Sequence, residues 1–313
     1  MKKLKIKSSS FFSYARLGML ALLLTSSSAV MAQEDQTAKD TTDEANTSAS
    51  VVKNRPVKNT FDGNYIIDQQ SVMVPIKGTL EFDLQHRFGI VNNGYSDFYG
   101  VYAPSIIRLA FEYVPVKNLQ LGFGLCKDRM QLDFNGKYAL LRQTKGGSPV
   151  SVTYYGNIDV DTRAKSNFVT NGDRYSYFNQ IIVARKITSN LSVQAALSLS
   201  HFNNIAGYID SEGVVRSTMQ NDQFTLSFMG RYKVSNSMSI LIDYDQPLTQ
   251  NLTNNPNPNL AFGLEITTSS HDFQIVVSNC QYILPQNNAL YNQNDFNKGQ
   301  YLIGFNMSRL WNF

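Results

Sequence analysis

The sequence has 313 residues, with 28 Lys and Arg, 24 Asp and Glu, 19 Phe, 17 Tyr and two cysteines. Residues 1–32 hold five of the basic residues and no acidic ones, so residues 33–313 carry 23 Lys and Arg against 24 Asp and Glu. The basic excess of the whole sequence therefore gives no support for a nucleic-acid partner. Cys126 and Cys280 are too few for a disulfide framework and match no metal motif, and whether they pair stays open.

Residues 1–32 are typical of a secretory signal peptide. Four lysines and Arg16 precede an apolar run at 17–24, and small residues lead to a cleavage site after Ala32. The run is far too short to span a bilayer as a helix. We therefore expect export and removal of this segment.

The next two segments differ sharply in composition. Residues 33–60 are almost devoid of apolar side chains, which predicts a disordered periplasmic leader. Residues 61–78 carry Ile66, Ile67, Val72, Val74 and Ile76, which predicts a packed stretch. This stretch either enters a barrel lumen as a plug or covers its mouth, or it packs on the periplasmic end of the first strand.

Residues 79–313 are dominated by alternation of apolar and polar side chains, the pattern of a strand with two different faces. In the clearest segment Leu80, Phe82 and Leu84 alternate with Glu81 and Asp83. The segment at 175–186 is ambiguous in phase. Twelve strands are predicted, at 80–88, 107–113, 119–126, 130–140, 150–158, 175–186, 191–200, 224–232, 238–245, 260–266, 273–277 and 301–313.

The connections between these strands alternate in length. Short turns are expected at 115–118, 142–149, 187–190, 234–237 and 268–271, and longer loops at 90–103, 160–173, 203–221, 246–259 and 281–299, while 127–129 is a short exception. Short periplasmic turns and long external loops are typical of outer-membrane barrels. We therefore predict an all-β, antiparallel transmembrane β-barrel of about twelve strands, with both ends in the periplasm.

A secreted, water-soluble β-sandwich is the alternative fold, because it also alternates polar and apolar residues. The signal peptide, the asymmetry of the connections and the C-terminus favour the barrel. The last strand ends in an apolar face that is typical of the signal read by the barrel-assembly machinery, with Phe305, Met307, Trp311 and Phe313.

Several short stretches also carry a resemblance to a known family. They are 61–63, 67–72, 78–82 and the motif His86-Arg87-Phe88-Gly89, and the similarity continues through 107–109 to about the C-terminus. With them the chain resembles an uncharacterised family of exported β-barrel proteins of Gram-negative bacteria, a domain of unknown function. The resemblance implies a fold and an outer-membrane location, and it implies no reaction, ligand or catalytic residue.

Charged residues on the polar phase are the candidates for lining the lumen. In a wide barrel such residues line a water-filled channel, and in a narrow one they neutralise one another. The candidates are Glu81, Asp83, Arg87, Arg108, Glu112, Asp133, Lys137, Arg231, Asp243, Asp245 and Glu265, with Asp272 on the same phase. Both a narrow passage for a small polar solute and a closed structural or binding barrel fit this pattern.

Catalysis is not expected, because no motif for it is present. His86 and His201 fall on the outward phase and His271 in a predicted turn, away from the serines and carboxylates of the other face. A lipid-modifying enzyme that uses His86 or His201 is the alternative from another functional class. No cofactor, metal or nucleic acid is expected, and the expected partners are outer-membrane lipid, the assembly machinery and a small polar solute.

Overall fold

A computed structural model describes residues 55–313 except residue 206. The expected signal peptide at 1–32 and most of the expected leader at 33–60 lie outside these residues. The last residues of that leader are described, and Pro56 forms an isolated β-bridge with Thr144 in the turn before the fifth barrel strand.

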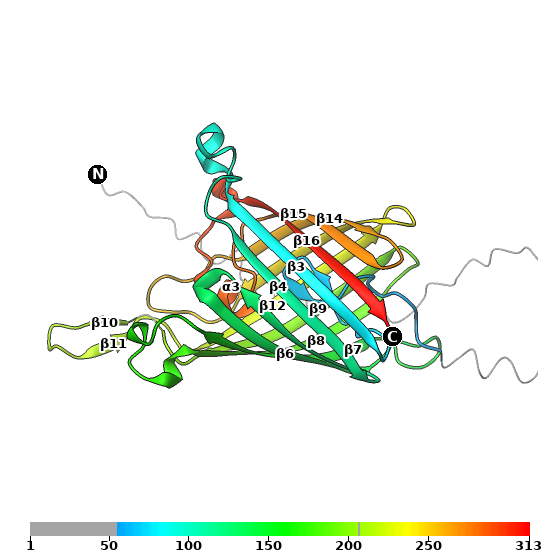
Figure 1. Ribbon diagram of the computed structural model, residues 1–313, viewed down its shortest axis with the longest axis horizontal. Coiled ribbons are helices and arrows are strands. Elements are labelled where there is room, and N and C mark those ends of the chain that lie inside the picture. Colours follow the sequence, from blue (N-terminus) through cyan, green and yellow to red (C-terminus); the bar gives the residue numbers. More distant parts are fainter. Residues whose placement is uncertain (1–54, 206) are drawn as a thin grey trace, which may run out of the picture. The chain divides into compact units, whose positions relative to one another are not determined.

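The described chain forms a closed antiparallel barrel of twelve strands, as predicted (Figure 1). The ring closes because the last strand pairs with the first and because β9 pairs with β12. The barrel strands are β3 (Thr79–Ile90), β4 (Ile106–Val116), β5 (Leu119–Cys126), β6 (Gln131–Leu141), β7 (Ser151–Asp161), β8 (Tyr175–Lys186), β9 (Leu191–Phe202), β12 (Asp222–Lys233), β13 (Met238–Pro247), β14 (Asn259–Thr267), β15 (His271–Ser278) and β16 (Leu302–Asn312).

The two faces of each strand meet opposite surroundings, and the apolar face is the outer one. In β6, Phe134 and Tyr138 are 50% and 45% exposed, whereas Asp133 and Lys137 are 0% and 1% exposed. A water-soluble sandwich buries its apolar faces between two sheets. The single closed ring with an apolar exterior excludes that alternative and is the arrangement that a lipid bilayer requires.

The structure of β8 explains why the alternation of polar and apolar residues in its sequence is ambiguous. Its buried, inward face carries Phe178 and Ile182 at 2% and 0% exposure, together with Ser176 and Gln180. Its outward face carries Ile181, which is 44% exposed. Both faces therefore hold apolar residues, and alternation of polarity is lost in this strand.

The connections also follow the predicted asymmetry. Turns at 117–118, 142–150, 187–190, 234–237 and 268–270 lie at one end of the barrel, the turn end, and longer connections lie at the other, the loop end. Both terminal strands meet at the turn end, where the Phe313 N–H donates to the Gly78 carbonyl at 3.2 Å.

Several connections contain short elements that the sequence pattern does not predict, among them the 3-10 helix Val91–Asp97 between β3 and β4. The connection between β9 and β12 holds the hairpin β10 (Gly207–Ile209) and β11 (Val215–Ser217), and the connection between β15 and β16 holds the helix α3 (Pro285–Tyr291). Figure 1 shows the hairpin reaching away from the loop end. Within the described residues, no helix combines the length and apolar character needed to cross a membrane.

Candidate functional site

The predicted lumen candidates all lie on buried faces of the barrel wall. The eleven residues range from 0% to 5% exposed, and Asp272, on the same phase, is 5% exposed. Their burial has one main cause: the space inside the ring is occupied by residues 60–74, which we call the insert. The insert holds the two-residue strands β1 (Tyr65–Ile66) and β2 (Gln69–Gln70), which pair as a hairpin.

The insert is held first by two ion pairs with the wall, one fully buried and one partly buried. Arg87 of β3 donates to the Asp68 carboxylate from Nη2 at 2.5 Å and from Nε at 3.2 Å. Arg231 of β12 pairs with Asp62 and donates to Glu265 at 2.6 Å. Guanidinium–carboxylate pairs buried in this way are strongly destabilised when one partner is removed.

Amide and hydroxyl groups add a second set of contacts around the ring. Gln69 donates to Asp245 of β13 at 2.9 Å, and the Lys137 ammonium of β6 donates to Gln70 at 2.9 Å. Between these two strands in the ring, Gln194 of β9 accepts from the Val72 N–H at 2.8 Å. The insert is therefore bonded to wall strands on several sides of the lumen rather than to one neighbour.

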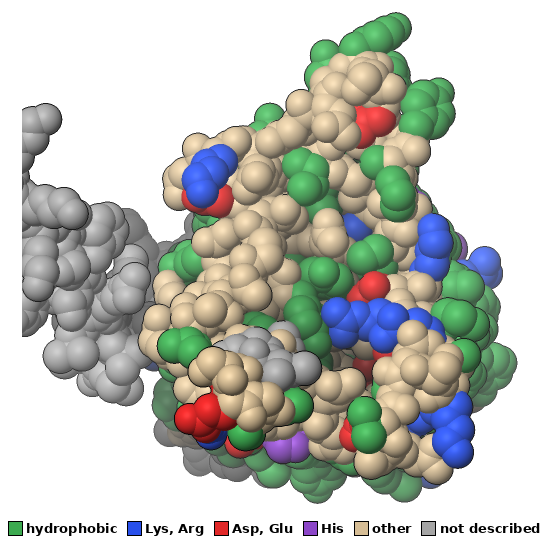
Figure 2. Space-filling view, turned by 90° about the vertical axis from the view of Figure 1, so that its left-hand side faces the viewer, with side chains coloured by type: hydrophobic (Ala, Val, Ile, Leu, Met, Phe, Trp, Pro, Cys, Tyr) green, Lys and Arg blue, Asp and Glu red, His purple; other side chains and the backbone are tan. Residues whose placement is uncertain are grey.

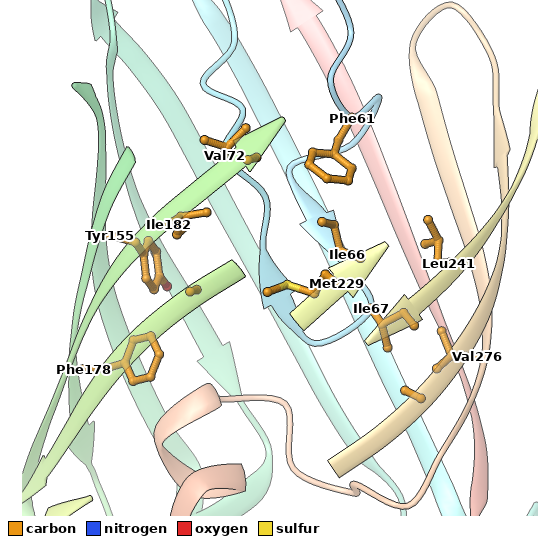
Figure 3. Close-up of a cluster of buried hydrophobic side chains, with 13 residues drawn as sticks. Phe61, Ile66, Ile67, Val72, Tyr155, Phe178, Ile182, Met229, Leu241 and Val276 are labelled. Carbon is orange, nitrogen blue, oxygen red and sulfur yellow. The ribbon is translucent and has the colours of Figure 1, made fainter. Parts of the chain in front are cut away.

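An apolar cluster forms the third contact (Figure 3). Four insert residues share it with inward side chains of the wall, and all are buried: Phe61, Ile66, Ile67 and Val72 meet Tyr155, Phe178, Ile182, Met229, Leu241 and Val276, among others. Ile76 was expected in this packed stretch but is 67% exposed, since the chain has left the lumen there to reach the first strand.

Helix α3 occupies the loop end of the lumen. Its side chains Gln286, Asn287, Asn288 and Leu290 are 0% to 1% exposed. Gln286 donates to Asn157 of β7 at 3.0 Å, and Asn287 donates to Gln131 of β6 at 2.9 Å. The lumen is thus filled from the turn end by the insert and from the loop end by α3.

Beside α3 a cavity of about 280 Å³ opens at the loop end. Its lining combines three guanidinium groups, three carboxylates and several aromatic rings: Arg129, Arg163, Arg174, Asp159, Asp161, Asp173, Phe168, Tyr175, Phe202 and Tyr291. In Figure 2, which faces this end, blue and red side chains lie next to one another.

The arginines around this cavity differ in whether they are paired with a carboxylate. Arg163 is bound to Asp161 through Nε and Nη2, and this hydrogen bonding raises the pKa of Arg163. Hydrogen bonds from Thr170 hold the pKa of Asp173 below its usual value. Arg129 lies over the Tyr291 ring at 4.1 Å and, among the described residues, has no carboxylate oxygen within 4.0 Å.

The motif His86-Arg87-Phe88-Gly89 divides between the two faces of β3. Arg87 points inward to the insert, whereas the His86 ring lies on the outer face, 4.3 Å from the Phe88 ring. Gly89 lies where the following loop comes close, so a Cβ there would lie 2.3 Å from Ala103 Cβ. The motif thus supplies one contact to the insert, through Arg87, and one position, Gly89, where the following loop packs closely against β3.

The histidines lie apart from one another and form no catalytic triad within the described residues. His201 pairs with Asp222 at 2.7 Å, and both residues are partly exposed at the loop end. The expectation that His271 lies in a turn is wrong: it begins β15, paired with Arg309, because the turn is one residue shorter than predicted. Ser270 Oγ lies 3.3 Å from His271 Nδ1.

Cys126 and Cys280 are both buried and free in this structure. The residues expected to form the C-terminal assembly signal lie along β16 and just after it. Phe305 is 37% exposed on the outer face, Trp311 lies beside Arg309, and Phe313 is 85% exposed at the end of the chain.

Comparison with known proteins agrees with this architecture. A family model described as "Membrane bound beta barrel domain (DUF5777)" matches residues 61–311. No curated protein matches the sequence.

Solved barrel structures are similar at low identity. An outer membrane channel from Pseudomonas putida F1 has 12% identity, with 76% of this chain and 97% of that chain covered and a TM-score of 0.48. The NanC porin has 11% identity, coverage of 75% and 99% and a TM-score of 0.45. The KdgM porin has 11% identity, the same coverage and a TM-score of 0.42.

Proposed function

The chain belongs to the family of membrane-bound beta barrel domains, and from that premise we propose that it is an outer-membrane barrel with a narrow passage for small polar solutes, closed by its own insert. The observation that carries the proposal is the polar wall that surrounds a separate stretch of chain. Charged groups that line a barrel set the selectivity of a passage when water replaces the packing inside.

The wall keeps polar groups that the insert does not use. Within the described residues, Ser200 and Thr225 each hold a buried hydroxyl oxygen with no hydrogen-bond partner, and one carboxylate oxygen of Asp243 is in the same situation. Buried polar atoms are normally paired with protein or water. A wall of this kind suits a hydrated lumen better than a permanently dry one.

The ion pairs between the insert and the wall allow the insert to be released and to bind again. Asp68 and Asp62 are insert residues, and their arginine partners Arg87 and Arg231 belong to the wall. When the insert withdraws, both sets of charges regain water, so the electrostatic cost of opening is far below that of breaking a pair inside the packed lumen. The cavity at the loop end then provides the external entrance.

A second candidate is a sealed barrel with a structural or binding role. The apolar cluster around Ile66, Ile67 and Phe178 favours it, because burying these side chains opposes withdrawal of the insert. A lipid-modifying enzyme is the third, and the partly exposed His201–Asp222 pair is the feature that would have to serve it.

Conductance of the purified protein in planar bilayers separates these functions. We expect the variant Asp62→Asn/Asp68→Asn to show frequent, discrete, ion-selective openings, at least tenfold more often than the wild type, because both insert ion pairs are lost. Asp210→Asn breaks only the partly exposed pair with Arg216 at the β10–β11 hairpin, outside the cavity, and serves as the matched control. A folded double variant that stays as silent as the wild type would favour the sealed barrel.

Export and assembly are proposed on the sequence alone. We propose that residues 1–32 are removed after Ala32 and that Phe305, Met307, Trp311 and Phe313 form the signal read by the barrel-assembly machinery. Replacing Phe313 with Ser should lower the amount of folded barrel in outer-membrane fractions without changing the amount synthesised.

A further inference from the structure

Three carboxylates meet inside the barrel on two neighbouring strands. The register of β3 and β4 places Glu81 directly opposite Glu112, and Asp83 follows two residues along the same face of β3. One oxygen from each of the three lies within 4.8 Å of the others, and the residues are only 1% to 2% exposed. Like charges directly opposite one another destabilise a sheet, so this arrangement needs a compensating charge.

The basic residues nearby supply it only in part, because the charge of Lys137 acts on all three carboxylates but neither Lys137 nor Arg108 forms an ion pair with them. Lys137 donates to Asn64 at 3.2 Å and to Gln70 at 2.9 Å rather than to a carboxylate. Arg108 is committed to Asp133 through Nε and Nη2, at 2.9 Å and 2.7 Å. Among the ion pairs of the described chain, none includes Glu81, Asp83 or Glu112.

A fourth side chain points into the same cluster. Gln120 of β5 is 1% exposed, and its amide nitrogen lies 2.5 Å from Glu112 Oε2 and 3.5 Å from Glu81 Oε2. The other amide atom, Oε1, has no partner within the described residues, and neither has Glu81 Oε1 or Asp83 Oδ2. A half-turn of the amide would replace these two donor contacts with Oε1, whose lone pairs would coordinate a cation lying among the carboxylates.

We propose that Glu81, Asp83, Glu112 and Gln120 bind a hard divalent cation, of the calcium or magnesium type. The donor set consists of carboxylate and amide oxygens with no sulfur or imidazole, which is the ligand chemistry these ions prefer. The cation supplies the positive charge that the three carboxylates lack, and it gives partners to the three orphaned oxygens.

The same carboxylates also hold the insert, so a bound cation would act on the closure of the passage. This step rests on the proposed function. Asn64 donates to Glu81, and the Tyr65 hydroxyl donates to Glu112 at 2.7 Å. A bound cation fixes both carboxylates in the positions that these insert residues need. We therefore infer that the cation favours the closed state of the passage.

The test is cation binding to the purified, signal-free barrel in detergent after treatment with a chelator. Calorimetric titration with Ca²⁺ or Mg²⁺ should show saturable binding to one site, and the midpoint of thermal unfolding should rise with the bound ion. Glu81→Gln/Glu112→Gln and, separately, Asp83→Asn should weaken binding at least tenfold. Asp159→Asn, which changes another buried carboxylate of the wall, should leave the affinity unchanged.

Two results would overturn the cation site. Absence of saturable binding by the wild type overturns it, as does equal affinity in the wild type and the two cluster variants. If the double variant does not fold, as judged by its strand content, Asp83→Asn decides the question. Binding without any conductance would keep the cation site and contradict the channel, whereas conductance without binding would do the reverse.

Discussion

Ile67 shows at the scale of one residue how tightly the wall shapes the insert. Its φ is 58°, a left-handed conformation that a β-branched residue adopts at a cost of about 1–3 kcal/mol. Gln274 accepts from its N–H at 3.2 Å, and Asn306 donates to its carbonyl at 2.7 Å. The surroundings therefore impose this conformation.

Arg87 provides the residue-scale prediction. Arg87→Met leaves Asp68 buried without its ionic partner, so we expect the free energy of unfolding to fall by about 3–5 kcal/mol. Arg163→Met removes a pair whose arginine side chain is 41% exposed, and there we expect a loss of less than about 1 kcal/mol. Urea unfolding in detergent, followed by fluorescence of the single tryptophan, measures both.

The double variant Arg87→Met/Asp68→Leu completes this comparison. Since neither charge then remains buried, it should regain much of the stability that Arg87→Met loses. Equal losses in Arg87→Met and Arg163→Met would contradict the assignment of Asp68 and Arg87 as a buried pair.

At the scale of elements, the insert hairpin depends on the barrel for its structure. Strands of two residues, Tyr65–Ile66 and Gln69–Gln70, are far too short to be stable alone in water. The barrel in turn surrounds the hairpin with side chains that complement it, such as Gln194 and Asp245. The insert is therefore an element whose order depends on docking, as expected of a gate.

A disulfide between the insert and the wall tests this directly. A Cβ at Gly263 of β14 would lie 3.3 Å from Ile67 Cγ1, the atom whose place a cysteine sulfur would take, so the two positions are near enough for a disulfide. In the frequently opening Asp62→Asn/Asp68→Asn variant that also carries Cys126→Ala and Cys280→Ala, we expect oxidised Ile67→Cys/Gly263→Cys to stop conductance in planar bilayers, and reduction to restore it. The single variant Ile67→Cys is the control, and unchanged openings in the oxidised pair would contradict a gating insert.

At the scale of the whole barrel, the asymmetry of the connections sets its orientation. Long connections such as 203–221 gather at the loop end, and both terminal strands meet at the turn end. Outer-membrane barrels place their short turns in the periplasm and their long loops outside the cell. We therefore predict that the insert enters the lumen from the periplasmic side.

Proteolysis of intact cells measures this orientation. Trypsin should cut after Arg216, in the β10–β11 hairpin, and after Lys165, because both residues are exposed in long loops. It should spare Lys117 and Lys233 at the turn end until the outer membrane is permeabilised. Cutting at Lys117 or Lys233 alone in intact cells would mean the opposite orientation.

The sequence alone was sufficient for the barrel, because the alternation of faces is a local property of each strand. Phe134 and Asp133 are neighbours in one strand and so point to opposite faces, and their polarity alone indicates that Phe134 meets lipid and Asp133 meets the interior. The same local reasoning fails where an inward face is apolar, as at Phe178 and Ile182, and where a polar loop folds back into the lumen, as helix α3 does.

The content of the lumen was decided only by the tertiary structure. A polar inward face suits water or a packed insert equally well, so the sequence left the two open. The pairing of Asp68 with Arg87 and the approach of Gln120 to Glu81 and Glu112 depend on strand register and on the path of residues 60–74. These are long-range relations between segments, and no short-range pattern of side chains encodes them.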